Sequence, residues 1–158
     1  MVPFSGIVWR ILFAEFADDP LSPARAPEGR FHHGGQPAIY TSLTAEGAGV
    51  AIQRYLTDND PPRVIVPLHV TAAGILDLRT GLDTSAQTPP TSVVWQDQRA
   101  MGHRASTWEI SDNARSIAAQ GMLYPARTRP DLGHLVLFGA PVPGTLRQSA
   151  PSQPWPMT

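Results

Sequence analysis

The sequence predicts a single small domain of the α+β class. Short segments rich in β-branched and aromatic residues, which are typical of strands, are mixed with two or three segments of helical character. The chain of 158 residues has the length of one domain and can bury one substantial core. No internal repeat is visible in it. We therefore expect one domain over residues 1–140, followed by a Pro-rich tail over residues 141–158.

The N-terminal part of the chain predicts two strands separated by a loop. Residues 6–13 (GIVWRILF) form the first strand, because β-branched and aromatic residues dominate them. Residues 18–29 contain four prolines or glycines in twelve positions, so we expect an irregular loop. Residues 38–42 form the second, short strand.

A helix is predicted next, over residues 45–56. Thr44 suits its N-cap, and Glu46 is favourable in its first turn. Two prolines end this helix, and residues 63–71 (RVIVPLHVT) form the clearest strand of the chain. Pro67 within that strand predicts a sheet edge or a bulge.

The remainder of the chain continues the mixed pattern. The expected elements are a strand at 74–78, a polar connection at 81–92, helical segments at 93–104 and 111–120, and strands at 122–124 and 134–138. Ser111 is expected to cap the second of these helices and Gly121 to end it. The tail from residue 141 holds five of the 17 prolines and has no periodicity, which predicts an end that follows the surface or is disordered.

Composition excludes several classes of function. The chain has no cysteine, which excludes a disulfide framework and any Cys-based metal site or nucleophile. Its net charge of −1 gives no electrostatic reason to expect nucleic acid or an anionic membrane as a partner. No apolar run approaches the roughly 18–20 residues that span a bilayer, and residues 6–13 lack the flanks of a signal peptide. We therefore expect a cytoplasmic protein.

The segment 29–42 carries the strongest functional signal. Arg30 lies before a Gly-Gly turn, and Tyr40 lies on the short strand that follows. A guanidinium suits a diphosphate, an aromatic face suits a base, and glycines let a ligand approach the backbone. Arg10, in the middle of an apolar strand, must face solvent, a partner or a ligand, because burial of an unpaired charge is costly. These residues predict a pocket for an anionic, planar ligand.

Other kinds of site have weaker support in the sequence. The five histidines include one adjacent pair, His32-His33, and none has a second ligand at a metal-binding spacing, so we expect structural or surface histidines and no metal. No G-x-S-x-G, P-loop or G-x-G-x-x-G motif occurs.

Several short motifs follow one another in a specific order along the chain. They are Trp9-Arg10, Gly29-Arg30-Phe31 with Gly34, Ile39-Tyr40-Thr41-Ser42, Gly121-Met122-Leu123-Tyr124-Pro125 and Leu135-Val136-Leu137-Phe138. This set, which covers residues 6–139, resembles the RES domain, the toxin of RES–Xre toxin–antitoxin pairs. The resemblance is greatest to the ParT-like branch of that family.

The resemblance implies a fold similar to diphtheria-toxin-like ADP-ribosyltransferases, with NAD as the substrate. The residues that it places around NAD are Arg10, Arg30, Phe31, Tyr40, Ser42 and Arg127, with Arg30 and Tyr40 also in catalytic roles. It implies mono-ADP-ribosylation of a host enzyme of nucleotide biosynthesis, such as phosphoribosyl pyrophosphate synthetase, with growth arrest as the result. An Xre-type antitoxin would cover the NAD pocket. Two alternatives stay open: destruction of NAD by hydrolysis or phosphorolysis, and a binding module with little activity.

The chain departs from the family pattern at two of the three residues that give the family its name. Arg30 matches the Arg, but the position expected for the Glu is Ala51 and the position expected for the Ser is Ala126. Such a carboxylate stabilises an oxocarbenium-like transition state, and its loss costs on the order of 10²–10³ in rate. Candidate replacements are Glu46 as a catalytic carboxylate, Glu109, and Gln53, which offers a hydrogen bond without charge.

Overall fold

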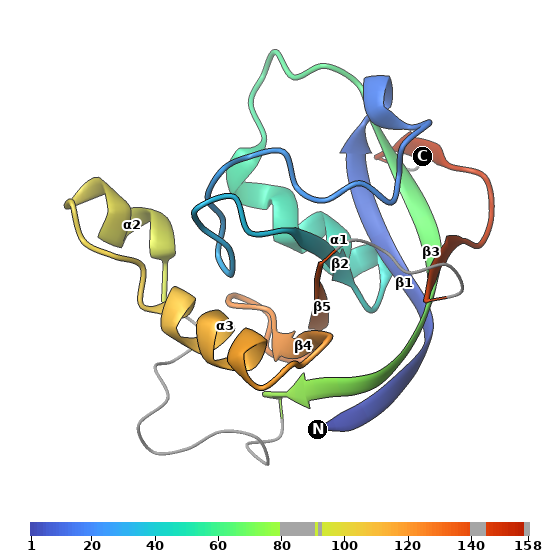
Figure 1. Ribbon diagram of the computed structural model, residues 1–158. Helices are drawn as coiled ribbons and strands as arrows, with labels where there is room; N and C mark the ends of the chain where they lie inside the picture. The colour runs from blue at the N-terminus through green and yellow to red at the C-terminus, as the bar shows by residue number, and fades with distance from the viewer. Residues whose placement is uncertain (80–90, 92, 140–144, 157–158) are drawn as a thin grey trace.

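The computed structural model describes residues 1–79, 91, 93–139 and 145–156. Its strands are β1 (Val2–Phe13), β2 (Ala38–Ser42), β3 (Arg63–Asp77), β4 (Gly121–Pro125), β5 (Gly133–Phe138), β6 (Leu146–Gln148) and β7 (Gln153–Trp155). Its α-helices are α1 (Ala45–Ile52), α2 (Trp95–Ala100) and α3 (Thr107–Ser116), and the 3-10 helices are η1 (Ala14–Phe16) and η2 (Gln53–Tyr55). This mixture confirms the predicted α+β class (Figure 1).

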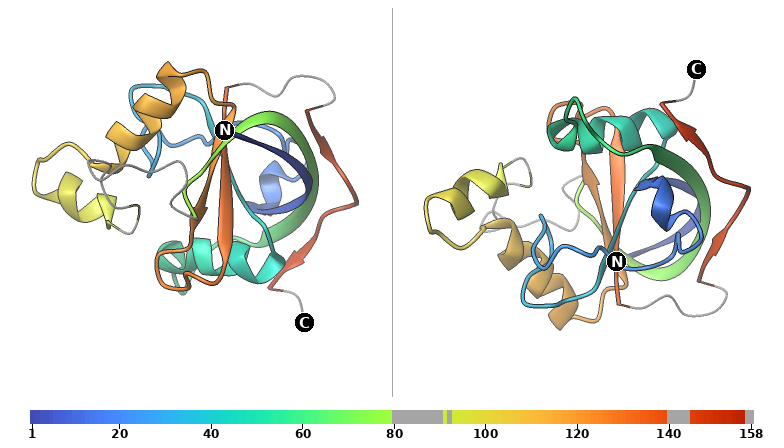
Figure 2. Two further views of the ribbon diagram at one scale, coloured as in Figure 1. Left: turned by 90° about the horizontal axis from the view of Figure 1, so that it is seen from below. Right: turned by 90° about the horizontal axis from the view of Figure 1, so that it is seen from above.

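The strands form one sheet that curls until it closes on itself. Its order is β1-β2-β5-β4-β3-β6, and β1 also pairs with β3, so the two ends of the path β1 to β3 meet. The β1–β3 pair is long and antiparallel, running from Val2 opposite Ile75 to Phe13 opposite Arg63. The pairing of β3 with β4 is parallel. Figure 2 shows the curl from below and from above.

Two clusters of buried apolar side chains hold the sheet together. The first lies inside the curl and includes Val8, Ile39 and Leu135. The second lies between the sheet and α3, and includes Met122 of β4 and Ile110 of α3. Successive residues of a strand point to opposite faces, so neighbouring positions of β2 and β5 contribute to different clusters. Helix α2 lies farthest from the sheet (Figures 1 and 2).

The boundaries of several elements differ from the sequence-based expectation. The strands expected at 63–71 and 74–78 are one continuous strand, β3, because its pairing with β1 continues to Ile75. Helix α3 begins at Thr107, and Ser111 lies inside it with its hydroxyl donating to the carbonyls of Thr107 and Trp108. The expected connection at 81–92 falls almost entirely outside the described residues.

Two short strands occupy part of the stretch expected to be a tail. Strands β6 and β7 pair antiparallel with β3, at Leu68–Val70 and at Arg63–Ile65. The end of the chain therefore follows the surface as a sheet edge, where proline is tolerated. Within the described ranges, no helix is long and apolar enough to cross a membrane.

Candidate functional site

A cavity of about 650 Å³ brings together five residues that the sequence placed in the site. Arg10 comes from β1, Tyr40 and Ser42 from β2, Arg30 from the loop before β2, and Arg127 from the loop after β4. Residues of α1 and η2 form another part of the lining, and the start of α2 contributes a further part. Residues that are 117 positions apart in the sequence thus line one site.

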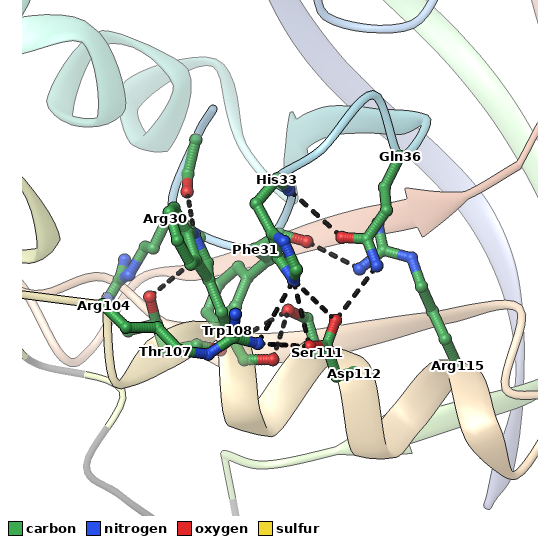
Figure 3. A network of polar contacts seen from close by, with 11 residues as sticks. Arg30, Phe31, His33, Gln36, Arg104, Thr107, Trp108, Ser111, Asp112 and Arg115 are labelled. Carbon is green, nitrogen blue, oxygen red and sulfur yellow. Dashed lines mark hydrogen bonds and ion pairs between the residues drawn. The ribbon is translucent and has the colours of Figure 1, made fainter. Parts of the chain in front are cut away.

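The turn that carries Arg30 is fixed by three side chains of α3 (Figure 3). The indole Nε1–H of Trp108 donates to the carbonyl of Gly29 at 2.7 Å. The hydroxyl of Thr107 donates to the carbonyl of Arg30. The guanidinium of Arg115 donates to the carbonyl of Phe31 at 2.8 Å. Three successive carbonyls therefore each have a partner on one helix, which holds the backbone of the turn in place.

A second layer of polar contacts supports the same turn (Figure 3). The ring of His33 stacks on Trp108 with centroids 4.6 Å apart, and its Nε2 lies 2.9 Å from a carboxylate oxygen of Asp112. Gln36 donates to Asp112 at 3.0 Å, and Arg104 donates to it at 2.6 Å. These hydrogen bonds lower the pKa of Asp112 against the opposing effect of burial, so the carboxylate stays charged.

The side chain of Arg30 lies between aromatic rings at the cavity. Its guanidinium carbon is 5.1 Å from the ring centroid of Tyr124 and 5.3 Å from that of Phe31. Its Nη2–H donates to the carbonyl of Thr91. Its buried Nε–H has no hydrogen-bond partner in the described part of the chain. Burial lowers the pKa of Arg30 from its usual value, which shows the cost of holding this charge away from water.

The hydroxyl of Tyr40 ties β2 to the Arg30 turn. It accepts the backbone N–H of Phe31 at 2.9 Å and lies 2.7 Å from Nδ1 of His32. Nε2 of His32 lies 2.8 Å from the carbonyl of Ala26, which can only accept, so Nε2 carries the proton and Nδ1 accepts from Tyr40. Burial lowers the pKa of His32, in agreement with a neutral ring. A Cβ on Gly29 would come within 2.3 Å of this imidazole, so only glycine fits there.

Arg10 performs a structural role as well as lining the cavity. Its Nη1 donates to the carbonyls of Pro20 and Ser22, at 2.8 and 2.6 Å, and its side chain is buried. Burial, and next the charge of Arg25, lower the pKa of Arg10 to about 10. Arg10 therefore fixes the loop between η1 and the Arg30 turn, and the same guanidinium borders the cavity.

Ser42 and His134 form a buried polar pair in the cavity wall. They lie opposite each other on β2 and β5, and Nδ1 of His134 is 2.7 Å from the hydroxyl of Ser42. Burial, and next the charge of Arg30, lower the pKa of His134 to about 4. The imidazole is therefore neutral at pH 7 and too weakly basic to remove the proton of Ser42 readily, so it orients the hydroxyl.

Three residues considered for the site do not line the cavity. Phe31 is fully buried in the second cluster, with its ring edge-on to Tyr124 at 4.8 Å. Glu46 lies exposed on the first turn of α1, where it pairs with Arg129 at 3.0 Å. Helix α1 turns Ala48 and Ala51 toward the cavity, and Glu46 is about 140° around the helix from Ala51. Glu109 is exposed on α3 and is also absent from the lining.

The cavity lining carries an excess of positive charge. Four arginines line it: Arg10, Arg30, Arg54 and Arg127. Among the described lining residues Glu28 is the one carboxylate, and it is paired with Arg99 at 3.0 and 3.1 Å. Ala51, where the family pattern has its Glu, lines the wall without any charge, and Gln53 lines the same wall. No group of three or more metal-ligating side chains occurs among the described residues.

Comparisons with known proteins show the family and the fold of this chain. The family model for the RES domain matches residues 7–158. The chain belongs to the RES domain family. The structure is also similar to the crystal structure of the M. tuberculosis MbcT–MbcA toxin–antitoxin complex, with a TM-score of 0.67 and 23% identity over 97% of this chain and 85% of that chain. At this identity the likeness shows a shared fold. A search of the curated proteins found no match.

Sequence reasoning missed part of this RES site. No motif around His134 predicts a place in the site, because its contact with Ser42 depends on a strand register that joins positions 92 residues apart. Arg54 was not singled out, because an arginine at the end of a predicted helix has no motif around it. The anchoring of the turn by α3 could be found only with the fold in hand.

Proposed function

We propose that this RES domain is a toxin that binds NAD in the cavity and transfers its ADP-ribose to a protein. The observation that carries the proposal is the Arg30 guanidinium, which lines the cavity on a rigid turn with a buried Nε–H that has no partner among the described residues. A buried donor without a partner costs about 1–3 kcal/mol, which a bound diphosphate oxygen would recover. A guanidinium fork fits that anion in two-point contact.

The other lining residues suit the remaining parts of NAD. Tyr40 offers a ring face near Arg30, and the Ser42 hydroxyl, oriented by His134, offers a hydrogen bond to a ribose hydroxyl. Arg10 and Arg127 add positive charge for the diphosphate. In the reaction, the bond between C1′ of the ribose and nicotinamide breaks, and nicotinamide leaves with the bonding electrons as a neutral amide. The acceptor side chain forms a new bond to C1′ and releases its proton to solvent.

The wall at Ala51 favours transfer to a protein over activation of water. Among the described lining residues no unpaired carboxylate is available to act as a general base. A protein acceptor brings its own nucleophile and its own neighbouring groups, so it depends less on such a base. The resemblance to the ParT-like branch indicates an enzyme of nucleotide biosynthesis, such as phosphoribosyl pyrophosphate synthetase, as the acceptor, with growth arrest as the outcome.

We also propose that an Xre-type antitoxin silences the toxin by covering the cavity. The MbcT–MbcA structure, which has the same fold, is that of a toxin–antitoxin complex. Four lining arginines would attract an acidic segment or a chain-terminal carboxylate through charge-assisted hydrogen bonds. NAD and the antitoxin should then compete. Independent, simultaneous binding of both in a calorimetric titration would contradict occlusion.

The deciding experiment incubates the purified protein with labelled NAD and a bacterial lysate. Label on a protein indicates transfer, free ADP-ribose or its phosphate indicates degradation of NAD, and binding without either product indicates a binding module. Arg30→Lys keeps the charge but loses the planar fork, so it should abolish labelling. Arg129→Lys is the matched control, because Arg129 is exposed, pairs with Glu46 and lies outside the cavity lining. Absence of NAD binding by the wild-type protein would refute the proposal.

A further inference from the structure

The charges in the cavity bear on which form of the ligand is bound best. All described charged residues of the lining are arginines except Glu28. The carboxylate of Glu28 accepts two hydrogen bonds from Arg99, so its charge is already compensated. Arg54 and Arg127 form no hydrogen bond or ion pair with other described residues. The uncompensated charge facing a ligand is therefore positive throughout the described lining.

This charge distribution has opposite effects on two parts of a nicotinamide dinucleotide. The diphosphate is negative and is attracted by the arginines, whereas the oxidised nicotinamide ring is positive and is repelled by them. Wherever the ring lies within the cavity, the described lining offers it no unpaired carboxylate. One aromatic face is already taken, because the guanidinium of Arg30 lies over the ring of Tyr124 at 5.1 Å. A ring without charge avoids the repulsion and keeps the diphosphate contacts.

We propose that the cavity binds NADH and ADP-ribose more tightly than NAD⁺. This inference rests on the proposed function, because it assumes a ligand of this class. It adds a form of regulation: free ADP-ribose and the reduced cofactor would both compete with the oxidised substrate for the cavity. The activity of the domain would then follow the ratio of NAD⁺ to NADH, with no second binding site.

NAD⁺ and NADH form a nearly isosteric pair that differs in the ring charge. We expect NADH and ADP-ribose to bind at least about tenfold more tightly than NAD⁺ at low ionic strength, a difference that corresponds to 1.4 kcal/mol. The preference should shrink as salt is added, because ions screen the exposed arginines. Isothermal titration of the unmodified protein with each ligand measures both effects.

Ala51 offers a direct test of the cause. It is exposed and lines the cavity on α1, so a longer side chain can enter without displacing the core. Ala51→Glu adds a negative charge to the wall and should reduce the preference for NADH to less than about threefold. Ala51→Gln is the matched control, with the same size and no charge, and should keep the preference. Thermal melting of both variants confirms that they fold.

The outcomes separate this inference from the proposed function. If none of the three ligands binds, the proposed function fails. If all three bind and NAD⁺ binds as tightly as or more tightly than NADH, the inference fails alone, and ring contacts with the cavity aromatics outweigh the arginines. A preference for NADH that Ala51→Glu and Ala51→Gln leave equally unchanged also overturns it, since charge would not be the cause.

Discussion

Replacement of Tyr40 by Phe removes one oxygen atom that two buried hydrogen bonds share. The hydroxyl accepts the Phe31 backbone N–H at 2.9 Å and donates to Nδ1 of His32 at 2.7 Å. Both partners belong to the turn that carries Arg30, and the Phe31 and His32 side chains are 0% and 2% exposed. Burial raises the pKa of Tyr40, so the hydroxyl stays protonated and its donor role holds at any physiological pH.

The magnitude follows from the groups left without partners. An unsatisfied buried backbone N–H costs about 1–3 kcal/mol, and the lost bond to His32 adds about 0.5–1.5 kcal/mol. Tyr40→Phe should therefore lower the free energy of unfolding by about 2–4 kcal/mol. For a domain of this size, that loss corresponds to a fall in Tm of roughly 5–15 °C. The ring face is kept, so any loss of NAD affinity reports on the position of Arg30.

Urea unfolding followed by tryptophan fluorescence measures this loss. Tyr55→Phe is the matched control: its hydroxyl bonds to Gln96 at 3.0 Å, but the residue is 54% exposed, so water replaces the bond and the cost should be under about 0.5 kcal/mol. If Tyr40→Phe is as stable as Tyr55→Phe, the hydroxyl does not hold the turn and our account of how Arg30 is positioned is refuted.

Two further predictions concern the polar groups around this site. The free energy of unfolding should fall as the pH decreases from about 6.5 to about 4. The unfolded chain binds a proton at His134 over that range, whereas the folded chain, in which the pKa of His134 is lowered to about 4, does not. This pKa difference corresponds to about 3 kcal/mol. His134→Asn should flatten this slope in urea titrations at several pH values, leaving the part due to His32, and an unchanged slope would contradict the assignment. Trp108→Phe keeps an aromatic ring, though a smaller one, and leaves the Gly29 carbonyl without its donor, so it should cost about 1–3 kcal/mol and weaken NAD binding in calorimetry. Wild-type affinity would show that α3 does not position Arg30.

The strands were predictable where local composition decides the structure. The β-branched run at 63–71 is strand in the structure, and Thr44 caps α1 by accepting the N–H of Gly47 at 2.9 Å. The merging of 63–71 with 74–78 depends on pairing with β1, which no local pattern reveals. Likewise β7 forms where a Pro-rich sequence meets the open edge of β3, so tertiary contacts override a composition that disfavours strands.

The candidate site was predictable from the sequence only where its residues share one segment. Arg30, Tyr40 and Ser42 lie within 13 positions, and their types suit an anionic planar ligand. Glu46 shows the limit of prediction from sequence spacing. It is close to Ala51 along the chain, but the helix turns its side chain to the solvent, where it pairs with Arg129. Phe31 shows a second limit of prediction from sequence, because its apolar ring stabilises the fold more when buried in the core than when it lines a solvent-filled cavity.

The architecture separates the groups that bind from the groups that would catalyse. Helix α3 fixes three carbonyls of the Arg30 turn, and Tyr40 fixes the N–H of Phe31, so the part of the cavity around Arg30 is held in place before a ligand arrives. Ala51, by contrast, supplies neither charge nor hydrogen bond, and its wall of the cavity carries no carboxylate among the described residues. Under the proposed function, rate acceleration would come from orientation of the ribose and from groups that the acceptor protein brings. A toxin of this kind would be selective for acceptors that complete the site, because without an acceptor the site would hydrolyse NAD slowly.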